Sequence, residues 1–269
     1  MYFRGCVRHK CFRHAALPLI ASFALLDPVP APSGILTTKL QDNTIGSWDK
    51  YIDKFEHSGY LARPMLDAGT DSPTLINLNP NGTNDGADVP GGYIHHWIGV
   101  IRIPNCSVAR VVAVLEDYDH YTEIYPEVKI ASAARMPGEA GRTYDVRLVT
   151  EQSERLGIHF AWDTRFHVSY STANDFTLIE SRSYRIREIS NGKARSTDFM
   201  PEGNDHGIVW RLNSYWRLRQ VGTSVYAELQ VINLSRKPLI GMRDLIESRA
   251  KNSLGATLWQ TRNRALRGG

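Results

Sequence analysis

Two charged side chains in an otherwise apolar strand pattern are the residues whose placement could serve chemistry. Glu180 and Arg182 occupy even positions of the predicted strand 175–189, as does Tyr184, so all three are expected on one face among apolar neighbours. A charge buried there needs a partner, water or a ligand, because isolated burial costs several kcal/mol. Arg182 could then hold a carboxylate or a phosphate. Alternatively, the strand lies at an edge or its alternation slips, and both charges are in water.

Motifs that would identify a catalytic mechanism are scarce. The chain has no Gly-x-Ser-x-Gly, no phosphate-binding glycine loop and no Cys-x-x-Cys. His95 and His96 are adjacent in a predicted strand, so they point to opposite faces and cannot readily chelate one ion together. Residues 117–125 are rich in Asp and Tyr; they could form an acid/base site, or pack a helix corner against the sheet. We therefore predict no catalytic residue, no metal site and no cofactor.

Alternation in two long strands predicts a sheet with one dry and one wet face. In 156–170 the even positions are nearly all apolar and include Trp162 and Phe166, whereas the odd positions include charged and imidazole groups. In the strand expected over 207–220 the even positions include Trp210 and Trp216, and the odd positions carry arginines. The dry face of this sheet therefore needs a cover.

The order of predicted elements is a strand, two short helices, six strands and a long helix. A strand over 93–103 is followed by a helix that Ser107 can cap. Turn residues bound six later strands, which are expected over residues 128–136, 142–151, 156–171, 175–189, 207–220 and 223–235. The last helix, 238–266, keeps apolar residues at a period of 3.6. We therefore predict an α+β fold in which a seven-stranded antiparallel sheet wraps around the long C-terminal helix.

Several short sequences in the second part of the chain carry a family resemblance. They are Gly91–Gly99, Leu115–Tyr121, Tyr125-Pro126, Trp210–Trp216, Val225–Leu229, Leu234–Arg236, Asn252–Leu254 and Thr261-Arg262. Together with the element order they resemble the START-like (SRPBCC, helix-grip) superfamily, and within it exported bacterial START-like domain proteins. The resemblance spans about residues 90–266 and implies a helix-grip fold with a cavity between sheet and helix. It does not fix a function, because the superfamily includes carriers, cyclases and hydrolases.

In such a fold the dry face is both core and cavity wall, which defines a set of candidate ligand-binding residues. Large aromatic side chains with a polar tip offer apolar area and one hydrogen bond. The candidates are Trp162, Phe166, Glu180, Arg182, Tyr184, Trp210, Trp216, Leu245 and Leu254. The alternative is that the apolar members are ordinary core residues, which any sheet-helix sandwich requires.

The first residues are typical of a secretory signal peptide. A basic stretch, residues 1–14, precedes an apolar run of twelve residues and a Pro/Ala/Ser stretch. The run is too short for a membrane-spanning helix, which needs about 20 residues. We expect a signal peptide over 1–33, an N-terminal extension over 34–90 with loops and one short helix capped by Ser47, and a START-like domain over 91–266. The protein is then periplasmic or secreted. If the run is instead an over-extended gene start or a short buried helix, the protein is cytoplasmic.

Charge argues against nucleic acid as a partner. The net charge is +4, from 32 Lys and Arg against 28 Asp and Glu, and residues 1–31 hold four of the basic residues against one acidic residue. The remainder is nearly neutral and has no basic stripe. We predict that the protein binds a hydrophobic small molecule or lipid, with transient membrane contact. The alternatives are a cyclase/aromatase-like or hydrolase-like enzyme that uses the same cavity, and an interaction module with a filled core.

Overall fold

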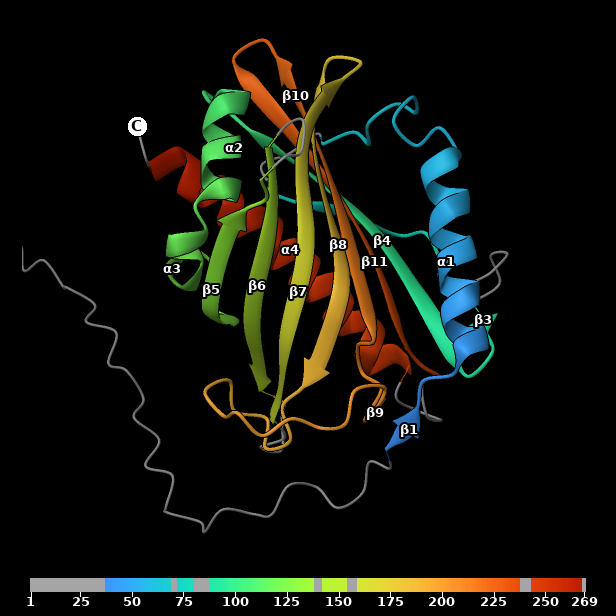
Figure 1. Ribbon diagram of the computed structural model, residues 1–269. Helices are drawn as coiled ribbons and strands as arrows, with labels where there is room; N and C mark the ends of the chain where they lie inside the picture. The colour runs from blue at the N-terminus through green and yellow to red at the C-terminus, as the bar shows by residue number, and fades with distance from the viewer. Residues whose placement is uncertain are drawn as a thin grey trace, which may run out of the picture.

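The structure is a computed structural model that describes residues 37–68, 72–79, 88–137, 142–153, 159–237 and 243–267 (Figure 1). The expected signal peptide, residues 1–33, lies outside the described residues, and so does Pro238, at which the last helix was predicted to begin. None of the described helices has the length and apolar character needed to cross a membrane.

The chain forms a large antiparallel sheet with helices on both of its faces. In chain order the elements are β1 (Thr38–Lys39), α1 (Asp42–His57), β2 (Thr74–Asn77), β3 (Asp88–Val89), β4 (Gly92–Ile103), α2 (Val108–Glu116), the 3-10 helix η1 (Tyr118–His120), α3 (Tyr121–Ile124), β5 (Val128–Arg135), β6 (Arg142–Ser153), β7 (His159–Ala173), β8 (Phe176–Glu188), β9 (Asn204–Asp205), β10 (Arg211–Val221), β11 (Ser224–Arg236) and α4 (Arg243–Arg267). Over the described residues the sheet order is β2-β4-β11-β10-β8-β7-β6-β5, with β3 paired to β4, and β1 pairs separately with β9. The predicted seven strands are all present. Because β2 and β3 also pair with β4, the predicted number was too small.

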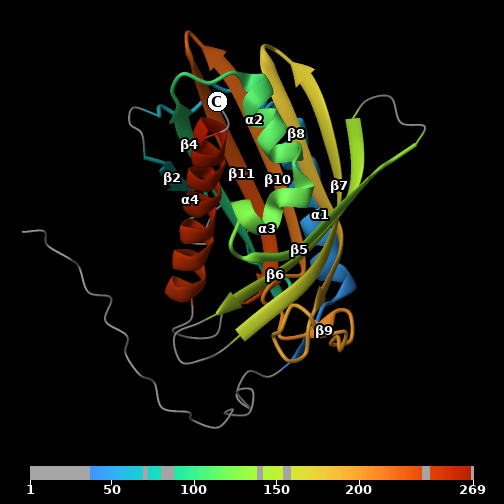
Figure 2. The same cartoon turned by 90° about the vertical axis from the view of Figure 1, so that its left-hand side faces the viewer.

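The long helix α4 covers one face of the sheet, and α1 lies against the opposite face (Figure 2). We call these the inner and the outer face. Gly99 of β4 permits the close approach of α4, because a Cβ at this position would lie only 2.6 Å from Leu258 Cδ1 and 2.7 Å from Leu75 Cδ2. Leu254 and Leu258 are buried in the main core together with inner-face residues of the sheet and with α2. The predicted role of the last helix as cover is therefore confirmed.

A second layer on the outer face is formed by the segment that precedes β2. Its helix α1 begins at Asp42, before the expected cap Ser47, whose hydroxyl instead donates to the Asn43 carbonyl at 2.9 Å. Trp48 and Ile52 lie one helical turn apart and are buried in a separate apolar cluster against β4, β10 and β11. The short helix expected in the N-terminal extension is thus present, and it covers a sheet face that alternation had predicted to be wet.

The helical corner between β4 and β5 closes one end of the inner face. Ser107 caps α2 as predicted, because its hydroxyl accepts the Arg110 amide at 3.3 Å. Val111 and Leu115 of α2 are buried in the core that also contains α4. The corner and α4 therefore enclose the same side of the sheet (Figure 2).

Candidate functional site

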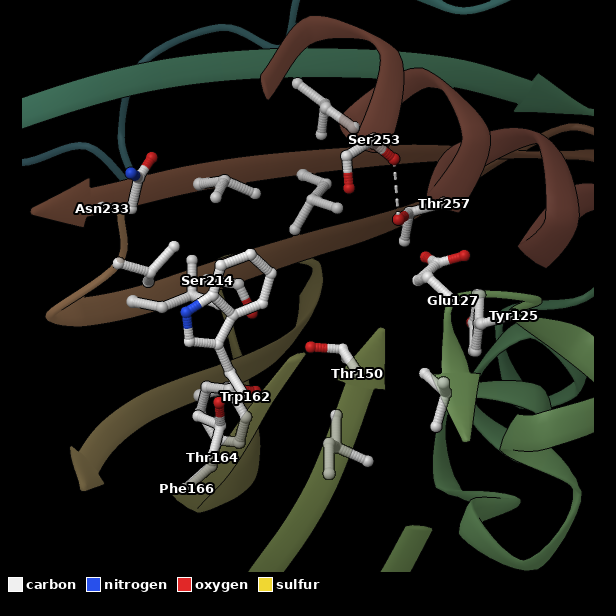
Figure 3. Close-up of a pocket in the computed structure, with 18 of the residues that line it drawn as sticks. Tyr125, Glu127, Thr150, Trp162, Thr164, Phe166, Ser214, Asn233, Ser253 and Thr257 are labelled. Carbon is white, nitrogen blue, oxygen red and sulfur yellow. Dashed lines mark hydrogen bonds between the residues drawn. The ribbon is translucent and has the colours of Figure 1, made fainter. Parts of the chain in front are cut away.

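A cavity of about 460 Å³ lies between the inner face, α4 and the helical corner. Its lining is mostly apolar and includes the tryptophans Trp97, Trp162 and Trp216. Figure 3 shows Trp162 and Ser214 on the strand side of the cavity and Ser253 on the helix opposite. Small-molecule sites in proteins have volumes of roughly 300–1,000 Å³ and similarly apolar walls. The size and lining of this cavity therefore suit a small organic ligand.

Four of the predicted binding residues line this cavity. Trp162 and Phe166 extend from the inner face of β7, as its alternation predicted. Trp216 comes from β10 and Leu254 from α4. The side chain of the alternative helix residue, Leu245, lies outside the described part of the chain. The structure therefore brings together predicted residues from two strands and the helix.

The predicted residues of β8 lie on the other side of the sheet. Ile179 and Ser181 line the cavity, so Glu180, Arg182 and Tyr184 were assigned to the wrong face. The reason is a bulge, since Arg165 of β7 pairs with Arg185 and the next β7 residue pairs with Ser183, which leaves Tyr184 as an extra residue. One continuous alternation over 176–188 does not exist, because the extra residue reverses it.

The charged pair of β8 binds the outer layer instead of the cavity. The Tyr60 hydroxyl donates to Glu180 Oε1 at 2.6 Å, and Arg182 Nε donates to Glu56 Oε1 at 2.8 Å. The Tyr215 hydroxyl donates to the same Glu56 oxygen at 2.7 Å. Arg182 therefore has acidic partners within the protein, and the predicted role as a holder of a ligand carboxylate or phosphate in the cavity is wrong.

Trp210 also lies away from the cavity. It precedes β10, which begins at Arg211 and not at the predicted residue 207. Its indole donates to Asp205 Oδ1 at 2.9 Å, and its ring is buried in the cluster with Trp48 and Ile52 of α1. Burial raises the pKa of the Asp205 carboxyl, although this hydrogen bond and one from a backbone amide oppose the rise. Strand alternation could not place Trp210 because the backbone at this position is not a strand.

A buried ion cluster was missed on the outer face. Glu228 of β11 and Arg217 of β10 are both fully buried, and Arg217 Nη1 lies 3.4 Å from Glu228 Oε1. Arg63 Nη2 donates to the same carboxylate at 2.6 Å, and Arg217 Nη1 donates to the Tyr60 carbonyl at 2.9 Å. This cluster fastens the chain that follows α1 onto the sheet. It lies on the face opposite the cavity, so it takes no part in the lining.

The tyrosine-rich corner is a packing element. The hydroxyls of Tyr118 and Tyr170 lie 2.8 Å apart, and the Tyr125 hydroxyl lies 2.9 Å from Thr261 Oγ1 of α4. Burial raises the pKa of all three phenols above the ordinary value, so they remain protonated at neutral pH. The Asp117 carboxylate lies 2.6 Å from His120 Nδ1. Of the two alternatives for residues 117–125, these contacts favour packing of the helix corner.

The adjacent histidines point to opposite faces, as predicted. His95 Nε2 lies 3.0 Å from Ser235 Oγ, whereas His96 faces α1 and has its Nδ1 2.9 Å from the Tyr51 hydroxyl and its Nε2 3.2 Å from Gln230 Oε1. Burial lowers the pKa of His96 to about 4, so this ring is neutral at pH 7. Among the residues that the structure describes, no three His, Cys, Asp or Glu side chains are grouped to hold a metal ion.

The polar groups of the cavity are mainly uncharged. Hydroxyls and amides line its strand side, among them Thr164, Ser181 and Ser214. Of the described lining residues, Glu127 and Arg249 carry charge, and neither comes from β4, β7, β8, β10 or β11. Burial lowers the pKa of the Arg249 guanidinium. The sheet therefore presents an apolar floor with a few neutral hydrogen-bonding groups.

Comparison with known structures identifies the class of fold. Human STARD10 superposes with a TM-score of 0.51 and 8% sequence identity over 86% of this chain and 82% of that one. Two bacterial structures align with TM-scores of 0.45. One is a STAR-related lipid transfer protein fragment from Xanthomonas axonopodis, which is 15% identical over 73% of this chain and 99% of that chain. The other is the Zhui aromatase/cyclase from Streptomyces sp. R1128, which is 16% identical over 65% of this chain and 95% of that chain.

The chain thus has the helix-grip fold of the START-like superfamily, with a long antiparallel sheet packed against a long C-terminal helix. No family model and no curated protein matches the sequence. At 8% identity the likeness concerns the fold, and the function has to be argued from the cavity itself.

Proposed function

We propose that the protein binds a hydrophobic small molecule or lipid in the cavity beneath α4. The observation that carries the proposal is the cavity of about 460 Å³, whose walls are mostly apolar and include Trp97, Trp162 and Trp216. Apolar ligand surface transferred from water to such walls contributes about 25 cal/mol per Å². A filled core would leave no cavity of this size. The enzymatic alternative loses support, because Glu180 and Arg182 face the outer layer.

The test is native mass spectrometry of the purified full chain, combined with solvent extraction. A co-purified mass of lipid or small-molecule size is expected. A Val168→Phe variant, which puts a ring into the cavity from β7, should lose this mass. Val221→Phe is the matched control, because Val221 is 49% exposed at the end of β10, and it should retain the mass.

A second measurement covers the case in which the natural ligand is lost on purification. Diphenylhexatriene, a fluorescent hydrocarbon, should bind the native chain and the Val221→Phe variant, and it should bind the Val168→Phe variant more weakly. Circular dichroism of each variant shows whether it has folded. The proposal is wrong if the native chain shows neither a co-purified mass nor hydrocarbon binding, or if folded Val168→Phe binds the dye as well as the native chain does.

A further inference from the structure

Two serine hydroxyls lie side by side in the middle of the cavity floor. Ser181 of β8 and Ser214 of β10 are direct partners in the antiparallel register, and both line the cavity. Such partners have Cβ atoms about 4.5–5.5 Å apart, so their hydroxyls can contact the same ligand atom. Val168 of β7 pairs with Ser181 on one side, and Val231 of β11 pairs with Ser214 on the other. The two hydroxyls are thus the polar centre of a row with apolar flanks.

The neighbouring row along the strands is apolar as well. Two residues further along, Trp216 of β10 pairs with Ile179 of β8, and both line the cavity. A ligand that fills the cavity therefore contacts hydrocarbon on several sides of Ser181 and Ser214. For simple packing, apolar residues would suit both positions better, because a buried hydroxyl needs a hydrogen bond.

Neither hydroxyl has a hydrogen-bond partner among the described residues. Other hydroxyls of the sheet are engaged. Ser183 Oγ accepts the Leu212 amide at 2.8 Å, and Ser235 Oγ donates to the Arg236 carbonyl at 2.9 Å. The Ser181 and Ser214 side chains are only half-buried, because they face the cavity. Their donors and acceptors are therefore available to a molecule in the cavity.

The floor around this pair carries no charge. Of the described residues that line the cavity, the charged ones are Arg249 on α4 and Glu127 before β5. A carboxylate or phosphate at Ser181 and Ser214 would have to leave water without a cation from the sheet beside it, which costs several kcal/mol. An uncharged oxygen loses far less solvation. An alcohol can both accept from and donate to serine hydroxyls, and a carbonyl can accept from them.

We infer that Ser181 and Ser214 form a binding site for an uncharged oxygen, either an alcohol or a carbonyl, on an otherwise apolar ligand. The inference rests on the proposed function, since it specifies the ligand of the same cavity. It makes the preferred ligand neutral and amphiphilic. The hydrocarbon part lies against the tryptophans, and the oxygen lies over the paired serines.

The test measures how well dodecanol, dodecane and dodecanoate displace diphenylhexatriene from the full chain. The three probes share one carbon skeleton and differ only at one end. The informative quantity is the ratio of the alcohol affinity to the alkane affinity. In the Ser181→Ala/Ser214→Ala double variant this ratio should fall about tenfold, the equivalent of one net hydrogen bond. Ser171→Ala is the matched control, because Ser171 is an exposed residue of β7 that does not line the cavity, and it should leave the ratio unchanged.

The outcomes separate this inference from the proposed function. If diphenylhexatriene binds all variants but the ratio stays constant, the serine site is refuted while the hydrophobic cavity site stands. If dodecanoate binds best and Arg249→Met abolishes that preference, the ligand is an anion held by α4, and the inference is again wrong. If neither the dye nor any probe binds the native chain, the proposed function fails and the inference fails with it. Equal dye affinity in native and double-variant protein shows that the cavity has kept its shape.

Discussion

Replacing Glu228 by alanine should loosen the outer layer from the sheet. The carboxylate of Glu228 is fully buried. It accepts a hydrogen bond from Arg63 Nη2 at 2.6 Å and another from the Leu66 amide at 3.2 Å, and it lies 3.4 Å from Arg217 Nη1. Arg217 is fully buried too. Removing the carboxylate therefore leaves a guanidinium in the protein interior without a counter-ion, beside a segment that has lost a backbone hydrogen bond.

The expected loss of unfolding free energy is large. Removing one partner of a buried ion pair costs about 3–5 kcal/mol, because the remaining charge is uncompensated. Arg63 adds little to this loss, because 30% of its side chain is exposed and water can solvate it after the change. Arg217 keeps its hydrogen bonds to the Tyr60 and Arg63 carbonyls, which places the loss near the lower end of that range. The total free energy of unfolding of a typical domain is only about 5–15 kcal/mol.

Urea unfolding of the full chain, followed by circular dichroism, measures this loss. Limited proteolysis should show faster cleavage in residues 58–66 of Glu228→Ala, because this segment packs over the cluster. Glu228→Gln keeps the shape and part of the hydrogen bonding, so its loss should be intermediate. Asp53→Ala is the exposed control, since the Asp53–His57 pair in the same layer is largely in water and should not matter. A loss in Glu228→Ala below about 1 kcal/mol would refute the argument from buried charge.

Three further predictions concern α4, the cavity and pH. Gly99→Val should lower the free energy of unfolding by about 1–3 kcal/mol in urea, because the new side chain would collide with Leu258, and an unchanged midpoint contradicts this contact. Trp216→Ala should weaken diphenylhexatriene binding and Arg182→Ala should not, because Trp216 lines the cavity whereas Arg182 binds Glu56 on the outer face. The reverse result would place the binding site on the outer face. The pKa of His96 is lowered to about 4, so its contribution to the free energy of unfolding is present above about pH 6.5 and is lost as pH falls toward 4. The loss amounts to up to about 3 kcal/mol, and the His96→Gln variant should lack this pH dependence of unfolding. Equal pH dependence of unfolding in the two proteins would count against this role.

The inner face could be predicted from the sequence because its signal is local. The even positions of β7 from Phe160 to Tyr170 are nearly all apolar, and these residues, Trp162 and Phe166 included, line the cavity. The long helix was equally readable from its apolar period, and Leu254 lies where that period predicted. The same rule failed on β8, because the extra residue Tyr184 reverses the alternation, and the composition of the strand gives no sign of it.

The outer layer could not be predicted by the same means, because it depends on contacts between distant parts of the chain. Tyr60 reaches Glu180, and Arg63 reaches Glu228, without any periodic pattern to link them. One signal was present. Phe176 shares the even positions of β8 with Glu180, and it is buried beneath the guanidinium of Arg217. An apolar ring on the same face as the charges indicated that this face is covered and not wet.

The outer layer also bears on the cavity, because it helps to hold the register that pairs Ser181 with Ser214. A slip of β8 by one residue against β10 would turn the Ser181 hydroxyl to the outer face, away from Ser214. Beside the bulge, Asn213 Oδ1 accepts the Ser183 amide at 3.3 Å, which adds a side-chain bond between the two strands. On the outer face, the Glu56 carboxylate binds both Arg182 of β8 and Tyr215 of β10, so α1 bridges the strands that carry the two serines. The first helix therefore contributes to the proposed ligand site without touching it, by keeping two cavity hydroxyls side by side.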